Sequence, residues 1–238
     1  MRRLLTALAA LLASQANALA QSAPWPDAET LTYTVNWPSG LSLGEAELQA
    51  ARRAPQENSP ARWELRFTLD AAVPGFTVAD RLRSAATPEL CSIEFERDTT
   101  HGRRSGKEVT TFDVSASTAT RQTVVPAGGG RSQMTTPPCA KDALAFLYFV
   151  RRELAEGRLA QSQTIFFGGP YQISFELGGR QKLRVGEEQF DVDRITALLK
   201  GPSTNVSFEV YFAQDRARRP VLIRVPLPLG AFTMELNP

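Results

Sequence analysis

The sequence predicts a mainly β protein: a single curled antiparallel meander, or half-barrel, of about 11 strands, with one main helix covering part of the concave face. Three observations support this fold class. Apolar and polar residues alternate along most of the chain, as in strands that bury one face. The connections are mostly short and contain glycine, so they suit hairpins better than parallel crossovers. Beyond residue 20, one long segment, 141–156, lacks glycine and proline and has a helical apolar pattern.

The chain opens with the three parts of a secretory signal peptide. Arg2 and Arg3 form a short cationic start, an apolar stretch follows, and Ala18-Leu19-Ala20 supplies small residues for cleavage. We expect a signal peptide over 1–20, cleaved near Ala20, and export to the periplasm. The alternative is a buried N-terminal helix. Residues 21–27, with two prolines, are expected to form a loose leader.

The charge balance and the hydropathy of the exported chain argue against a nucleic-acid partner and against a transmembrane helix. The full sequence has 27 Lys and Arg against 25 Asp and Glu, and loss of Arg2 and Arg3 with the signal peptide leaves 25 of each. Nucleic-acid-binding domains typically have a strong basic excess, so we expect no nucleic-acid partner. No later stretch of about 18 apolar residues occurs, so we also expect no transmembrane helix.

The first strands are predicted from apolar side chains that share one face. In chain order these faces are Leu31/Tyr33/Val35/Trp37, Ala46/Leu48/Ala50 and Trp63/Leu65/Phe67/Leu69. The pattern is less clear over 76–83, which suits a short strand or a helical turn. Segments 90–97 and 108–114 predict a hairpin with its tip at 98–106.

Residues 114–139 are predicted to form a long flexible loop. This segment combines Ser and Thr runs with three consecutive glycines and a Pro-Pro pair. Part of it, near Thr118 to Val125, has the alternation of a strand and is expected to extend the sheet.

The segment 141–156 predicts a largely buried helix, because its apolar surface is wider than a single stripe. Asp142 lies near the start, and Arg151 and Arg152 lie towards the end, an arrangement that suits the helix dipole. Gly157 is the expected stop.

The remaining sequence predicts strands in close succession. They are 164–167, 171–177, 181–185 and 189–195, followed by the apolar faces Val206/Phe208/Val210/Phe212, Val221/Ile223/Val225/Leu227 and Phe232/Met234/Leu236. Connections at Gly168–Pro170, Gly178–Gly179 and Gly186 predict hairpin turns. With the earlier strands, these segments predict one β-rich domain over 28–238.

Cys91 and Cys139 are the two cysteines of the chain. In an oxidising compartment such a pair most simply forms a disulfide. A bridge across this separation stabilises the fold by roughly 4 kcal/mol in the chain-entropy model. The alternative is a pair of unpaired thiols, one of them buried as a small apolar side chain.

Ser42 is the residue that most resembles a catalytic nucleophile. It lies within Gly40–Gly44, which matches the nucleophile-elbow pattern, and Asp98 and His101 follow in the expected chain order. That motif requires a strand, a sharp turn and then a helix. Here strand-like segments lie on both sides, so the glycines are better explained as a hairpin turn.

Other polar groups also suit a solvent-exposed surface. His101 is the only histidine, so a site with several histidines is excluded. Its neighbours Arg103 and Arg104 predict a solvated turn or, alternatively, a small basic patch for an anionic envelope surface. Glu94 and Glu96 share a strand face, and paired carboxylates perform glycoside hydrolysis, but strands carry such pairs routinely. We expect no enzyme activity, no metal and no cofactor.

Several stretches resemble a known family. They are Leu31–Val35, Gly44–Ala46, Asp142–Arg151, Asp215–Val221 and Pro226–Leu236. In these stretches the chain resembles the exported bacterial family called domain of unknown function 3108, most specifically in the Asp142 helix and the 219–230 ending. The resemblance brings no catalytic residues. Exported meanders with a helix are also similar to lipoprotein-carrier half-barrels, in which helices cover an apolar concave sheet.

More large apolar side chains share strand faces than one helix covers, which indicates a concave apolar pocket. The residues expected to line it are Trp63, Leu65, Phe67, Phe208, Val210 and Phe212. We therefore expect a periplasmic protein that binds an apolar or amphipathic envelope ligand, a lipid or an acyl group. There are two alternatives: these side chains fill the core completely, or the protein is an envelope scaffold without a small-molecule ligand that uses a sheet edge or the outer face.

Overall fold

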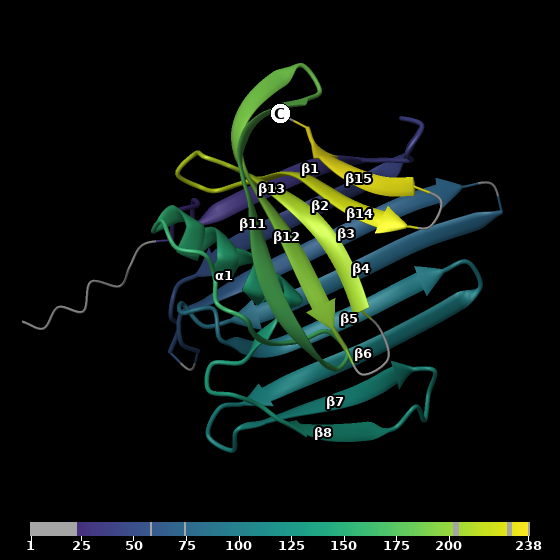
Figure 1. Ribbon diagram of the computed structural model, residues 1–238. Helices are drawn as coiled ribbons and strands as arrows, with labels where there is room; N and C mark the ends of the chain where they lie inside the picture. The colour runs from purple at the N-terminus through teal and green to yellow at the C-terminus, as the bar shows by residue number, and fades with distance from the viewer. Residues whose placement is uncertain (1–22, 58, 74, 202–204, 228–229, 238) are drawn as a thin grey trace, which may run out of the picture.

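One curled sheet dominates the computed structural model, which describes residues 23–57, 59–73, 75–201, 205–227 and 230–237 (Figure 1). All 15 strands found in these residues belong to this sheet, in the order β8-β7-β6-β5-β4-β3-β2-β1-β15-β14-β13-β12-β11-β10-β9. The predicted signal peptide over 1–20 lies outside the described residues.

The elements alternate with short connections along the chain. Before the helix the strands are β1 (Ala28–Asn36), β2 (Ser42–Arg53), β3 (Arg62–Val73), β4 (Phe76–Ala86), β5 (Ser92–His101), β6 (Arg104–Asp113), β7 (Thr118–Val125), β8 (Arg131–Thr135) and β9 (Lys141–Asp142). The helix is α1 (Ala143–Ala155). After it come β10 (Gln163–Phe166), β11 (Pro170–Val185), β12 (Glu188–Lys200), β13 (Asn205–Ala213), β14 (Pro220–Leu227) and β15 (Gly230–Leu236).

The first and last strands of the domain pair with each other. β1 and β15 run antiparallel, with Tyr33 opposite Leu236 and Val35 opposite Met234. This pairing joins the meander β1–β8 to the meander β10–β15, and β9 adds a parallel pair with β10 at the far edge. The predicted fold class, a curled antiparallel meander with one helix, is confirmed, with more strands than expected.

Apolar residues stand opposite each other across the N-terminal strands. Leu31 lies opposite Leu48, Leu48 opposite Phe67, and Phe67 opposite Leu82. Such cross-strand neighbours stabilise a sheet that buries one face. A shift of one residue would turn the whole apolar set to solvent, so this pattern fixes the register.

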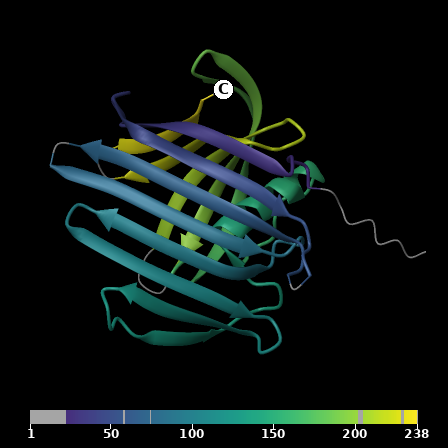
Figure 2. The same ribbon diagram turned by 180° about the vertical axis from the view of Figure 1, so that it is seen from behind.

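α1 lies inside the curl, between the N-terminal and the C-terminal strands (Figures 1 and 2). Leu144, Ala145 and Tyr148 pack into a first cluster of buried apolar residues, which contains residues of β1–β5 and also of β11–β15. Phe146 and Val150 pack into a second cluster, which contains the inner faces of β10–β13. Burial on two sides explains why the apolar surface of this helix is wider than one stripe.

The helix begins at Ala143, slightly later than predicted. Lys141 and Asp142 pair with β10 as a short parallel strand, and Asp142 is the N-cap. At the other end Gly157, the predicted stop, has a φ of +75°, which glycine adopts without strain.

Gly178 and Gly179 do not form the predicted hairpin turn. β11 continues through them as a 16-residue strand, and its pairing with β12 passes from Leu177 opposite Ile195 to Arg180 opposite Asp193. β11 therefore carries one extra residue in this interval, which is a β-bulge. A bulge preserves pairing on both sides, so one long hairpin replaces the two shorter ones expected.

Much of 114–139, predicted as a long flexible loop, forms two strands. β7 is the part near Thr118 to Val125 where we expected the sheet to extend, and β8 pairs with it as the edge strand. The glycine run forms the turn between them, with φ of +78° at Gly128 and +89° at Gly130. The glycine run therefore forms part of the short connection that lets β8 pair with β7.

Two predicted segments near β5 are also longer strands. The segment over 76–83, left open between a strand and a helical turn, is part of β4. The hairpin tip predicted at 98–106 is narrower, because β5 and β6 pair as far as His101 opposite Arg104. Opposite charges face each other along this added stretch, with Asp98 opposite Lys107, which favours its pairing.

Gly44→Ala should strongly destabilise the protein. A Cβ at Gly44 would lie 1.9 Å from the backbone oxygen of Asp70 on β3, so one of the strands must move. Overpacking a rigid site costs about 1–3 kcal/mol, and we expect at least that loss in the free energy of unfolding measured in urea. Gly169→Ala is the control, since its Cβ meets nothing within 4 Å. Equal losses in the two variants would contradict the close approach of β2 and β3.

Candidate functional site

The structure places the predicted ligand-lining residues in two different parts of the core. Phe208, Val210 and Phe212 on β13 lie in or against the second cluster. Trp63, Leu65 and Phe67 on β3 lie in or against the first cluster. The six residues therefore belong to two clusters and do not form one site, and α1 contributes side chains to both clusters.

An apolar cavity of ≈ 120 Å³ lies between α1 and the strands β10–β13. Phe208, Val210 and Phe212 line it, and every other lining side chain is also apolar. Phe212 is 2% exposed, whereas Phe175, Leu199 and Phe208 are half-buried and bring one side of the cavity to the molecular surface. A cavity lined by apolar side chains can accept an apolar group.

The helix and β12 walls of this cavity were not predicted. Phe146 and Leu147 come from α1, and Ile195 and Ala197 come from β12. The alternation of Ile195, Ala197 and Leu199 is a sequence signal that could have extended the apolar face. The sequence does not show which strand faces meet the helix, because that depends on how the sheet curls.

Asp142 fixes the start of α1 and is 0% exposed. Its Oδ1 accepts hydrogen bonds from the backbone N–H groups of Leu144 and Ala145, at 2.9 and 3.0 Å. Its Oδ2 accepts hydrogen bonds from the hydroxyls of Ser84 on β4 and Ser92 on β5, at 2.6 and 2.5 Å. Burial raises the pKa of this carboxyl, and the hydrogen bonds oppose the rise. The N-cap therefore couples the helix to β4 and β5.

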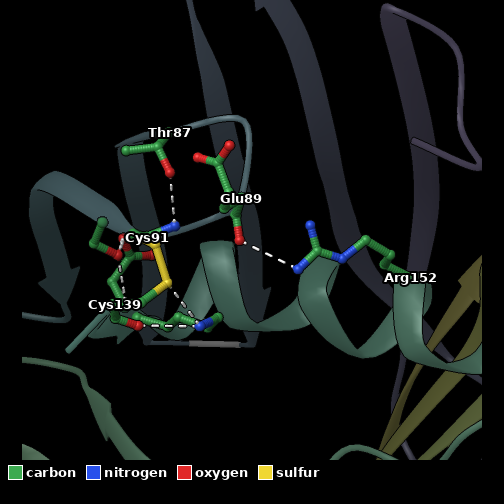
Figure 3. The surroundings of a disulfide bond; sticks show 8 residues. Thr87, Glu89, Cys91, Cys139 and Arg152 are labelled. Atoms are coloured by element: carbon green, nitrogen blue, oxygen red, sulfur yellow. Dashed lines mark hydrogen bonds between the residues drawn. A yellow bond between two sulfur atoms is a disulfide. The ribbon is translucent and has the colours of Figure 1, made fainter. Parts of the chain in front are cut away.

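A disulfide between Cys91 and Cys139 ties the segment before α1 to the β4–β5 turn (Figure 3). The two Cα atoms lie 4.5 Å apart, which suits the predicted pairing. Further along the helix, an Arg152 guanidinium nitrogen donates to the Glu89 carbonyl oxygen in the same turn at 3.2 Å. Both links hold α1 against the N-terminal half of the sheet.

Lys141 is a buried cation beside this disulfide. It is 6% exposed, and its Nζ lies 3.0 Å from the carbonyl oxygen and 3.3 Å from the Sγ of Cys139. The same ammonium lies 4.6 Å from the centre of the Phe149 ring. Burial, reinforced by the charge of Arg152, lowers the pKa of Lys141.

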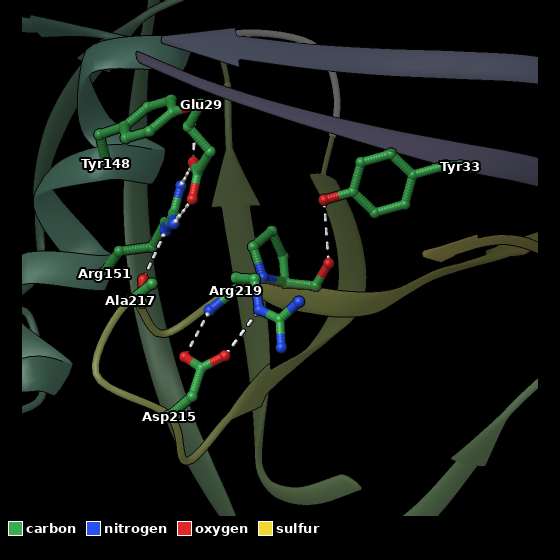
Figure 4. A network of polar contacts seen from close by, with 8 residues as sticks. Glu29, Tyr33, Tyr148, Arg151, Asp215, Ala217 and Arg219 are labelled. Carbon is green, nitrogen blue, oxygen red and sulfur yellow. Dashed lines mark hydrogen bonds and ion pairs between the residues drawn. The ribbon is translucent and has the colours of Figure 1, made fainter. Parts of the chain in front are cut away.

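A second buried charge, Arg151, holds the far half of α1 (Figure 4). Its side chain is 0% exposed, and that of its partner Glu29 on β1 is 6% exposed. The guanidinium donates two hydrogen bonds to the Glu29 carboxylate, at 2.7 and 2.8 Å, and one to the Ala217 carbonyl oxygen at 3.0 Å. Burial opposes the charge, but the contacts with Glu29 outweigh it and raise the pKa of Arg151. One side chain thus joins β1, α1 and the β13–β14 connection.

Aromatic rings surround this ion pair. The Arg151 guanidinium lies 5.0 Å from the Trp25 ring and 4.8 Å from the Tyr148 ring. Trp25 is 4% exposed and contacts Trp63 edge-on. The segment over 21–27, predicted as a loose leader, therefore contributes a core residue. Removing the large Trp25 ring from water stabilises the folded state.

The candidate catalytic residues lie on the surface of separate hairpins. Ser42 is exposed at the start of β2 and pairs with Asn36 on β1. His101 ends β5, and its Nε2 lies 2.8 Å from Asp80 on β4. Glu96 on β5 binds Lys107 at 3.1 Å, so it is engaged in a cross-strand pair. The described contacts do not join Ser42 to His101.

The described residues contain no helix that is long and apolar enough to cross a membrane. A solved structure resembles the fold over most of both chains: a β-barrel-like protein of domain of unknown function DUF1849 from Brucella abortus. The two superpose with a TM-score of 0.55, covering 88% of this chain and 95% of that chain at 7% sequence identity. At this identity the likeness shows the fold alone.

A family model described as "Protein of unknown function (DUF3108)" matches residues 32–237. No curated protein matches the sequence. The family match spans the helix, both cysteines and the cavity, and it confirms the resemblance inferred from the sequence.

Removing the disulfide should lower stability without unfolding the protein. In the Cys91→Ser/Cys139→Ser variant we expect a loss of about 2–4 kcal/mol in the free energy of unfolding. Urea denaturation monitored by tryptophan fluorescence measures this loss. A reductant should lower the stability of the parent towards the variant value and leave the variant unchanged. A parent that is insensitive to reductant would contradict the bridge.

Breaking the buried ion pair from one side should be more damaging than replacing both partners. Glu29→Ala leaves the Arg151 guanidinium buried without its carboxylate, which costs about 3–5 kcal/mol. The double variant Glu29→Leu/Arg151→Met removes both charges and should recover part of that loss. Thermal and urea unfolding of the single and double variants test this, and additive losses would show that the two side chains do not interact.

Proposed function

Since this chain belongs to the DUF3108 family, whose function is unknown, we propose one from the chain's own geometry: a periplasmic protein that binds the apolar part of a lipid or acyl-bearing molecule. The binding site is the cavity between α1 and β10–β13. The observation that carries this proposal is a cavity of ≈ 120 Å³ whose walls are wholly apolar.

The size of the cavity defines the part of the ligand that it holds. Engineered apolar cavities of about 150 Å³ stay dry and bind benzene or xenon. The cavity here is of similar size, so it accommodates the end of an acyl chain or a small apolar group. It does not enclose a whole lipid.

The open side of the cavity determines where the rest of the ligand lies. Half-buried Leu199 and Phe208 line the cavity next to the β12–β13 connection. A chain whose end lies between Phe146 and Phe212 therefore leaves past these two side chains towards solvent. This arrangement favours an amphipathic molecule, with an apolar end inside and a polar end outside.

The export signal and the disulfide support a periplasmic location. The sequence over 1–20 has the cationic, apolar and small-residue parts of a signal peptide. The Cys91–Cys139 bridge suits an oxidising compartment. Both features are expected of a protein that meets envelope lipids.

The edge of the sheet favours a second candidate function. β8 (Arg131–Thr135) pairs with β7 alone among the described strands, so its outer backbone groups are available to another strand. An envelope scaffold could use this edge to bind a partner protein by strand addition. This function needs no ligand in the cavity.

Ligand binding can be tested on the exported protein with two matched phenylalanine variants. Phe208→Ala changes the cavity wall, and Phe67→Ala removes a half-buried ring that lies against the first cluster. We expect decanoate to bind the parent and Phe67→Ala alike in calorimetric titration. Phe208→Ala should change the affinity several-fold, because the chain contacts that ring.

Mass spectrometry of organic extracts gives an independent measurement. The parent purified from its native periplasm should carry an apolar or amphipathic molecule, and Ala197→Leu, which fills the cavity, should carry none. A parent that binds no decanoate and yields no extractable molecule would contradict ligand binding and favour the scaffold.

A further inference from the structure

One end of the sheet collects a set of hairpin turns. Because the strands β1–β8 form a meander, their alternate turns lie at the same end, and the pairings of β15 with β1 and of β13 with β14 bring two more connections there. Figure 1 shows the β1–β2, β5–β6 and β7–β8 turns on the side of the molecule away from α1. We call this end the turn rim. It comprises the described residues of the segments 36–42, 73–76, 101–104, 124–131, 200–206 and 227–230.

Five of the ten exposed large apolar side chains of the described residues lie on the turn rim. They are Leu41 at 63% exposure, Phe76 at 47%, Val124 at 43%, Val125 at 40% and Val206 at 39%. Single exposed apolar residues are ordinary, but a set gathered on one end of a molecule marks an interaction surface.

Phe76 connects two of the turns on this rim. A Cβ on Gly102 would lie 3.0 Å from the Phe76 ring, so the ring rests against the tip of the β5–β6 hairpin. Phe76 and His101–Arg104 also line one shared surface hollow. The apolar ring and the basic tip therefore act as one surface.

The charge of the turn rim has one sign. Its segments contain Arg103, Arg104, Arg131 and Lys200, all exposed, and no Asp or Glu. The turns at the other end of the meanders contain acidic residues, namely Glu57, Glu89, Asp113 and Asp215. Three acidic side chains lie close to the rim on β4 and β5: Asp80 is paired with His101 at 2.8 Å, Glu96 with Lys107 at 3.1 Å, and Asp98 lies 3.9 Å from the same Lys107.

We propose that the turn rim docks on an anionic lipid bilayer. The apolar side chains at the turn tips enter the interfacial region, and the arginines contact headgroup phosphates. Exposed apolar tips flanked by cations suit a bilayer surface, because the acyl chains and the headgroup phosphates lie close together at the membrane interface. A second copy of the chain does not fit the same rim, because its arginines would face arginines of like charge.

The position of the rim relative to the cavity agrees with this partner. Leu199 and Phe208 line the open side of the cavity and flank the β12–β13 connection, which is part of the rim. A molecule leaving the cavity on this side would face the bilayer. The docking surface itself does not require the cavity to be occupied, so the two proposals can fail separately.

Vesicle co-sedimentation tests the proposal directly. The protein is purified after export, with its disulfide intact and its N-terminus checked by mass spectrometry. It is mixed with vesicles of phosphatidylcholine alone or of phosphatidylcholine with phosphatidylglycerol. We expect binding to the anionic vesicles, weaker binding to the neutral ones, and a loss of binding as salt screens the charges.

Matched variants separate the rim from the rest of the surface. Arg103→Glu should weaken binding to anionic vesicles at least about five-fold, the effect of one basic residue near such a surface. Phe76→Ser should weaken it about ten-fold, since an inserted ring loses its burial. The controls are Arg216→Glu and Val114→Ser, which change an exposed arginine and an exposed valine at the other end. Both controls should bind like the parent.

The results that would overturn the proposal are equally specific. They are no binding to either kind of vesicle, equal binding to both kinds, or losses in the controls as large as those in the rim variants. Retention of an acidic partner protein without vesicle binding would assign the rim to a protein partner and also overturn it. Circular dichroism of each variant confirms that the fold is intact.

Discussion

The buried ion pair between Arg151 and Glu29 is the contact that connects β1, α1 and the β13–β14 connection. A guanidinium with 0% of its side chain exposed is tolerated only when hydrogen bonds and an opposite charge replace water. Glu29 and the Ala217 carbonyl supply them, so β1, α1 and the β13–β14 connection must meet at one point. Since β1 also pairs with β15, this contact joins the first strand, the helix and the last hairpin of the domain.

The start of the helix is held by different chemistry at a separate place. Asp142 caps the helix and binds Ser84 and Ser92, while the Cys91–Cys139 bridge ties the preceding segment to the β4–β5 turn. A helix fixed near both ends cannot shift to fill the space beside it. The apolar cavity lies beside this fixed helix, between α1 and β10–β13.

The two ends of the sheet differ in the chemistry of their turns. Acidic residues, the disulfide and the helix start lie towards one end, and the opposite rim carries apolar tips with Arg103 and Arg104. Antiparallel topology keeps the two groups of turns apart, because successive turns of a meander lie at opposite ends of the sheet. The backbone hydrogen-bonding groups of the strands between the turns are satisfied by strand pairing, so the strands form the scaffold that holds the turns. The distinguishing chemistry therefore lies in the turns and around the helix.

The sequence by itself determined the strand faces, the buried helix and the cysteine pair, because period-two alternation, a wide apolar helical surface and two cysteines are local or countable features. It mistook Gly178–Gly179 for a turn, since glycine is common in both bulges and turns and only the pairing with the partner strand distinguishes them. The sequence predicted that Arg151 interacts with the dipole near the end of the helix, whereas in the structure Arg151 is buried and paired with Glu29. Only the tertiary structure separated Trp63 from Phe212, because the curl of the sheet decides which faces meet α1.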